Sequence, residues 1–126
     1  MVQLVKESDD ILLKEGTRNT PFIQITKYGN IVISGNVKDP SLDKLFLSLF
    51  WGTNKILSNS VTVTLDIDIL SVKAVKNIFL LLRVLSNQVN INEIVVIWLY
   101  SDEEELDLIE TYKEALPLVK FLNYKK

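Results

Sequence analysis

The sequence contains neither cysteine nor histidine, and these two absences exclude more functions than any other feature of the 126-residue chain. Without them the chain cannot build a Ser-His-Asp or Cys-His nucleophile, a zinc site of the usual ligand types or a thiol redox centre. Only carboxylates, lysine, tyrosine, serine and threonine remain for catalysis. We therefore expect no metal ion and no cofactor.

The sequence also lacks a basic stripe and a long apolar run. Its 14 Lys and Arg residues are dispersed among 16 Asp and Glu residues, and the formal net charge of −2 gives no attraction to nucleic acid. No apolar run approaches the ~18 residues of a membrane-spanning helix, and acidic residues within the N-terminal apolar stretches exclude a signal peptide. We expect a cytoplasmic protein that binds neither nucleic acid nor membrane.

Apolar periodicity divides the chain into strands and helices. Period-two alternation around the turn residues Tyr28, Gly29 and Asn30 predicts a β-hairpin. Strands are predicted at 21–27, 30–35, 61–69, 94–100 and 118–124, and helices at 42–50, 72–85 and 101–116. A chain of this length fits one domain, so the sequence predicts a single-domain α/β fold over 1–126, in which residues 1–15 are a leader that can be irregular.

One face of the strand at 61–69 is polar, because Thr62, Thr64, Asp66 and Asp68 alternate with apolar residues. The apolar row must meet the core, so we expect the helices mainly on that face of a mixed sheet, with the polar face partly open to water. Strand-helix-strand crossovers are right-handed and make the later strands parallel. The predicted order is β-β-α-β-α-β-α-β.

Asp66 and Asp68 are the first candidate site. Residues two apart on one strand face have Cα atoms about 6.5 to 7 Å apart, where two carboxylates can share acid-base work in a small hydrolase or lyase. The alternative is a solvated strand face that continues Thr62 and Thr64. No histidine, third carboxylate motif or glycine loop accompanies the pair. Both interpretations stay open at this point.

Ser71 is the second candidate, because it follows a predicted strand and precedes a predicted helix. Its hydroxyl can accept a hydrogen bond from a first-turn N–H as an N-cap. The same geometry suits a phosphate, which would meet the N–H groups and positive dipole of the helix beside Lys73 and Lys76. Asp66 and Asp68 would repel that phosphate unless they point elsewhere. Ser71 is therefore either a cap or a switch.

The strand at 94–100 and the acidic run after it are the remaining candidates. Trp98 and Tyr100 share one strand face, which is either a protein-binding surface patch or part of the core. The run DEEELD at 102–107 lacks the glycine and ligand alternation of a calcium loop, and it fits a helix start, where carboxylates are favoured. Ser101 and Glu104 have capping-box spacing.

Four segments together resemble the bacterial SiaC-type family of small regulatory phosphoproteins. They are EGTRNTP at 15–21, GNIVISG at 29–35, SVKAV at 71–75 and IWLYSDEEE at 97–105. The resemblance implies the STAS-like (SpoIIAA-like) fold of anti-sigma-factor antagonists, which agrees with the order of elements predicted above. It also implies partner switching: a kinase phosphorylates the protein, a PP2C-type phosphatase reverses this, and the unmodified form binds a target such as a diguanylate cyclase.

The chain departs from the family pattern at the segments that would carry regulation. The family's junction between strand and helix reads approximately N-T-S-S-x-K. When this pattern is aligned with DILSVK, the family's phosphorylated threonine falls at Ile69, which has no hydroxyl. Ser71 and Lys73 match that junction, while Asp68 stands where the family has an amide. A second departure lies in GNVKDPS at 35–41, where the family has its proline one residue nearer the glycine, followed by an acid.

The resulting hypothesis is a divergent, non-enzymatic member of the family that binds a signalling protein. The predicted binding residues are Asp68, Ile69, Leu70, Ser71 and Lys73. Ser71 would be a cap or a secondary phosphoacceptor. The alternative from another class is a structural homo-oligomer, such as a homodimer, that pairs through the open sheet face near Trp98.

Overall fold

The computed structural model describes residues 9–37 and 42–126, and at Leu42 and Ile69 the backbone only. Six strands form one mixed sheet in the order β1-β2-β3-β4-β5-β6. The elements in chain order are Asp10–Lys14 (β1), Phe22–Thr26 (β2), Asn30–Asn36 (β3), Leu42–Thr53 (α1), Ser60–Ile69 (β4), Val72–Ser86 (α2), Glu93–Tyr100 (β5), Glu103–Ala115 (α3) and Val119–Lys125 (β6).

The predicted order of elements is confirmed from β2 onward. β2 and β3 form the predicted antiparallel hairpin, and β3 to β6 are parallel. Gly29 lies in the hairpin turn with φ +91°, in the left-handed region that favours glycine. A Cβ at this position would lie 2.3 Å from the Ser60 carbonyl oxygen, so glycine is required there.

β1 lies inside the segment for which an irregular leader was expected. It pairs with β2 antiparallel and forms one edge of the sheet, with a register shift between Asp10 and Leu12. The shift interrupts period-two alternation within a strand of five residues. That interruption is why the sequence pattern did not reveal the strand.

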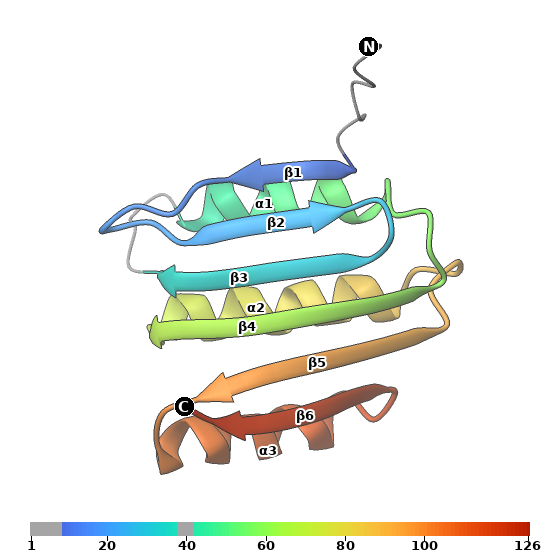
Figure 1. The fold of residues 1–126 in the computed structure, drawn as a ribbon. Coiled ribbons are helices and arrows are strands. Elements are labelled where there is room, and N and C mark those ends of the chain that lie inside the picture. Colours follow the sequence, from blue (N-terminus) through green and yellow to red (C-terminus); the bar gives the residue numbers. More distant parts are fainter. Residues whose placement is uncertain (1–8, 38–41) are drawn as a thin grey trace, which may run out of the picture.

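All three helices cover the same face of the sheet, as predicted (Figure 1). Alternate strand residues point at these helices and are fully buried, and the largest of these side chains are those of Trp98, Ile23, Ile25, Ile31, Ile33, Leu65 and Ile67. No helix of the described ranges covers the opposite face, where Thr62 and Thr64 are half-buried beside Val95, Ile97 and Leu122. None of the helices in the described part of the chain combines the length and apolar character that a membrane crossing requires.

Candidate functional site

The junction between β4 and α2 places Ser71 at the start of a helix. Ser71 has an extended backbone (φ −82°, ψ 162°), and its hydroxyl accepts a hydrogen bond of 3.1 Å from the Ala74 N–H. Its carbonyl oxygen also accepts the Val75 N–H at 3.0 Å. The N-cap prediction is therefore confirmed, while phosphorylation of Ser71 remains a prediction.

The first turn of α2 keeps two backbone donors available. The Val72 and Lys73 N–H groups have no acceptor within residues 9–37 and 42–126. The turn also contains no acidic residue. These donors and the positive end of the helix dipole therefore face the exterior without an anion on the helix itself.

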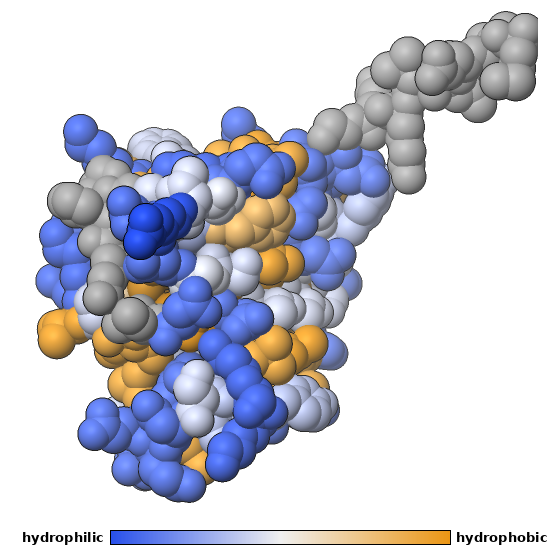
Figure 2. Space-filling view, turned by 60° about the vertical axis from the view of Figure 1, so that its left-hand side comes forward, coloured by the Kyte–Doolittle hydropathy of each residue, from blue (hydrophilic) through white to orange (hydrophobic). Residues whose placement is uncertain are grey.

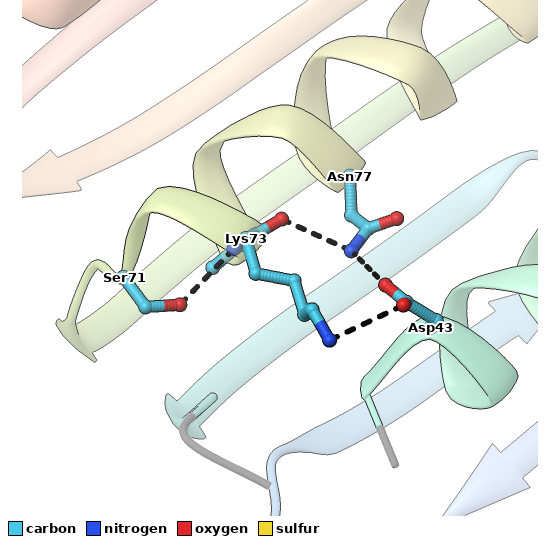
Figure 3. Close-up of polar contacts among 5 residues, drawn as sticks. Asp43, Ser71, Lys73 and Asn77 are labelled. Carbon is cyan, nitrogen blue, oxygen red and sulfur yellow. Dashed lines mark hydrogen bonds and ion pairs between the residues drawn. The ribbon is translucent and has the colours of Figure 1, made fainter. Parts of the chain in front are cut away.

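A carboxylate from another helix approaches this turn (Figure 3). Asp43, in the first turn of α1, lies 3.3 Å from the Lys73 ammonium and accepts a 3.1 Å hydrogen bond from the Asn77 side-chain amide. The same amide donates to the Lys73 carbonyl oxygen at 3.0 Å. The hydrogen bond from Asn77, followed by that from Lys73, lowers the pKa of Asp43. The contact joins the two helix starts beside the junction.

A cleft of about 460 Å³ opens between this junction and the next one, β5–α3. Its lining includes the acidic residues Asp68, Asp102, Glu104 and Glu105, with the apolar residues Leu70, Val75 and Leu108. Figure 2 brings this end of the molecule forward and shows apolar patches separated by hydrophilic side chains. This mixture of apolar and polar side chains matches the composition of protein interfaces and of ordinary protein surface alike.

The predicted binding residues lie at this end of the molecule. Asp68 and Lys73 are exposed, and Leu70 is half-buried against the core. The backbone of Ile69 ends β4 and pairs with Asn36, while its side chain lies outside what the structure describes. The second departure from the family pattern, at residues 38–41, also lies outside the described residues.

The structure does not bring Asp66 and Asp68 together as a catalytic pair. Asp66 forms an ion pair of 2.8 Å with the Lys126 ammonium, which also donates to the Ile67 carbonyl oxygen at 3.0 Å. Asp68 lines the cleft, and Asp66 does not. In the described ranges, no three acidic side chains lie close enough to hold a metal ion. The interpretation of Asp66 and Asp68 as a catalytic acid-base pair therefore lacks a structural basis. The alternative interpretation, a solvated strand face, agrees with the position of Asp66.

The β5–α3 junction is capped one residue later than predicted. Asp102, and not Ser101, is the N-cap of α3 and accepts the Glu105 N–H at 2.9 Å. The Glu105 carboxylate folds back and accepts the Ser101 N–H at 3.1 Å and the Trp98 indole N–H at 3.0 Å. The predicted pairing of Ser101 with Glu104 is therefore wrong. The sequence contained one signal for the actual pairing, because a buried tryptophan needs an acceptor for its N–H.

The surface patch proposed for Trp98 and Tyr100 is also wrong. Trp98 is fully buried, and Tyr100 is half-buried against the core. The Trp98 ring packs on Tyr112, with centroids 5.4 Å apart, and the Tyr112 hydroxyl donates to the Val75 carbonyl oxygen of α2. Burial raises the pKa of Tyr112. The homo-oligomer hypothesis thus loses the residue on which it depended.

Comparisons with known proteins identify the family. The sequence model of the SiaC family of regulatory phosphoproteins matches residues 14–125. Apo-SiaC from Pseudomonas aeruginosa shares the fold with a TM-score of 0.76 at 18% identity, over 93% of this chain and 99% of that chain. A chain in the structure of the diguanylate cyclase SiaD with its activator SiaC, from the same organism, gives a TM-score of 0.77 at 19% identity, over 91% and 99%. No curated protein matches significantly. Because the family match spans most of its length, this chain belongs to the SiaC family of regulatory phosphoproteins.

Proposed function

We propose that this chain is a non-enzymatic, cytoplasmic regulator that binds a signalling protein through the β4–α2 junction. The observation that carries the proposal is an exposed helix start whose Val72 and Lys73 N–H groups have no acceptor in the described part of the chain and whose first turn, unlike that of α3, contains no acid. The side chains of Asp68 and Lys73 are exposed at the same junction. A partner loop that brings a carboxylate or a carbonyl oxygen to this turn would complete its hydrogen bonding.

The partner belongs to a partner-switching pathway, as a kinase, a PP2C-type phosphatase or a diguanylate cyclase. Family membership supports this class of partner, since a relative of the same fold, SiaC, activates the diguanylate cyclase SiaD. The described residues also offer no competing catalytic arrangement, because Asp66 is held by Lys126 and no metal-binding cluster is present among them. The chain acts as a ligand for other proteins.

The regulation of this binding depends on Ser71. With Ile69 at the family's threonine position, Ser71 is the hydroxyl that remains at the junction. A phosphate on Ser71 would add negative charge at the N-terminus of α2, beside Lys73, and Asp68 would oppose it. Binding is therefore either switched at Ser71 or constitutive.

The experiment measures binding by isothermal titration calorimetry, with a purified kinase, phosphatase and diguanylate cyclase encoded near this chain as the probes. We expect Asp68→Arg and Lys73→Glu each to weaken one of these complexes by roughly tenfold or more, because both charges lie in the proposed contact. Lys120→Glu, an exposed charge reversal on β6, is the control and should bind normally. Unchanged binding of both junction variants would refute the proposed surface.

The state of Ser71 is measured separately by mass spectrometry after reaction with the kinase. Phosphate on Ser71, absent from Ser71→Ala, would establish a switch at this junction. Absence of phosphate, combined with tight binding of the unmodified chain, would establish constitutive binding.

A further inference from the structure

The outer surface of α1 exposes a large apolar pair. Leu47 is 54% exposed and Trp51 is 69% exposed. They lie four residues apart, which places them one above the other on the same helix face, with Lys44 one turn earlier. Exposed tryptophan is uncommon on a surface that contacts only water, and tryptophan contributes strongly to protein interfaces. This pair therefore calls for a partner.

The neighbouring helix α2 continues this surface. Two contacts link the two ends of α1 to α2 and to the loop after it: Asp43 with Asn77 of α2 at 3.1 Å, and Thr53 with Gln88, two residues past the end of α2, at 2.7 Å. The α1 partners are ten positions apart, and Asn77 and Gln88 are eleven positions apart, so α1 and α2 run parallel and nearly in step. Leu47, four residues after Asp43, therefore lies level with Leu80, three residues after Asn77, and Leu80 is 36% exposed.

Positive charge surrounds the three apolar side chains. Lys76 and Arg83 lie one turn before and after Leu80 on α2 and are exposed, as is Lys44. None of these three cations forms an ion pair within the described ranges, and α2 contains no acidic residue. Asp43 is the acid of this region, and its charge is matched by Lys73. We define Lys44, Leu47, Trp51, Lys76, Leu80 and Arg83 as the α1–α2 ridge.

We propose that the α1–α2 ridge docks an acidic amphipathic helix of a partner protein. Leu47, Trp51 and Leu80 form an exposed apolar strip, and a third helix can lay apolar residues spaced by three and four positions against it. The unpaired cations select carboxylates on the flanks of that helix. The ridge lies on the helix layer and extends away from the β4–α2 junction, so the inference is independent of the proposed function.

A second copy of this chain does not match the ridge. Its acidic helix α3 carries Glu103, Glu104, Asp107, Glu110 and Glu114, and so complements the charge. However, none of the strongly exposed large apolar side chains lies on α3. Such a contact would leave Leu47 and Trp51 without apolar partners. The occupant must present acids and apolar residues together.

The experiment uses two stapled helical peptides that share one leucine face and carry glutamates or lysines at all other positions. Binding is followed by two-dimensional NMR of the indole N–H of Trp51, which is distinct from that of buried Trp98, the second of the two tryptophans. The glutamate peptide should shift the Trp51 signal, with affinity that falls as salt is raised. Leu47→Ser and Lys76→Glu should each weaken binding by roughly tenfold.

Val89→Ser is the matched control, because Val89 is an exposed apolar residue in the loop after α2, outside the ridge. Its binding should equal that of the unchanged chain. Absence of a Trp51 shift, or equal shifts with the two peptides, would overturn the proposal. A Trp51 shift with phosphatidylglycerol vesicles but not with the glutamate peptide would assign the ridge to a lipid surface instead. A shift caused by raising the protein concentration alone, with dimers in sedimentation, would assign it to a second copy.

Discussion

The turn between β4 and α2 and the turn between β5 and α3 line the same cleft, and each starts its helix with an oxygen-bearing N-cap residue. At the first turn the cap is the neutral Ser71, and the helix start has no acid of its own. At the second turn the cap is Asp102, and three glutamates follow it. Glu105 among them turns inward to bind Ser101 and Trp98.

We call the β5–α3 turn the structural junction and the β4–α2 turn the binding junction. The β5–α3 junction carries carboxylates of its own, and the Glu105 carboxylate connects it to the core through Trp98. Each junction leaves the first two helix N–H groups without an acceptor in the described chain, those of Val72 and Lys73 at α2 and those of Glu103 and Glu104 at α3. The first turn of α2 has no acid of its own, and Asp43, which reaches that turn, comes from another helix. Two helix starts of the same capping geometry therefore differ in charge, because α2 presents its free N–H groups without a carboxylate of its own and α3 presents them among glutamates.

The largest change in stability is expected from a substitution that disrupts the structural junction. Glu105→Ala leaves the buried Trp98 indole N–H and the Ser101 N–H without an acceptor, and should lower the free energy of unfolding by about 3 kcal/mol. Urea denaturation followed by circular dichroism measures the change. Glu104→Ala, at an exposed neighbour, is the control and should change stability by less than about 0.5 kcal/mol. Equal losses in the two variants would contradict a special role of Glu105.

A smaller effect is expected at the binding junction. Ser71→Ala removes the oxygen that accepts the Ala74 N–H and should cost about 1 kcal/mol in the free energy of unfolding. Ser71→Asp restores an N-cap acceptor and adds charge that favours a helix start, so its stability should lie near that of the unchanged chain. If Ser71→Asp is as unstable as Ser71→Ala, repulsion from Asp68 outweighs the cap.

The smallest expected effect concerns the acid that α1 brings to the binding junction. The pKa of Asp43 is lowered below its ordinary value of 3.8 in the folded chain. The ionised form is therefore bound more favourably in the folded state, and this stabilisation is present above the unfolded pKa and lost as pH falls through the folded pKa. Asp43→Asn should lower stability at about pH 6 and have less effect at about pH 3. An NMR titration that gives Asp43 an unshifted pKa would contradict this contact.

Sequence periodicity predicted the regular helices and strands. It failed where contacts between residues distant in sequence determine the structure. The hairpin, the three helices and the parallel strands follow from local apolar patterns. The strand β1 was missed, since its register shift removes the alternation that marks a strand. Trp98 could not be assigned to a face, because β5 is apolar at nearly every position and both faces look alike.

The polar contacts were less predictable than the elements. Ser71 was found as a cap because capping depends on residues three positions apart. By contrast, the ion pair of Asp66 with Lys126 joins residues 60 positions apart, and local spacing contains no information about it. Ser101 with Glu104 and Asp102 with Glu105 have the same local spacing, so spacing alone could not choose the cap, and the bond from the Trp98 indole N–H to Glu105 is visible only in the structure. Likewise, the α1–α2 ridge emerged only when the structure placed two helices side by side.

The sheet order β1-β2-β3-β4-β5-β6 has a consequence for how the chain acquires its structure during synthesis. Every strand of the described chain pairs with the strands immediately before and after it in sequence. Each strand that leaves the ribosome after β1 therefore finds its partner already made, and the helix between two parallel strands can close over them at once. Because such pairings span short sequence separations, we expect the chain to fold progressively from β1 toward β6, without waiting for a distant segment.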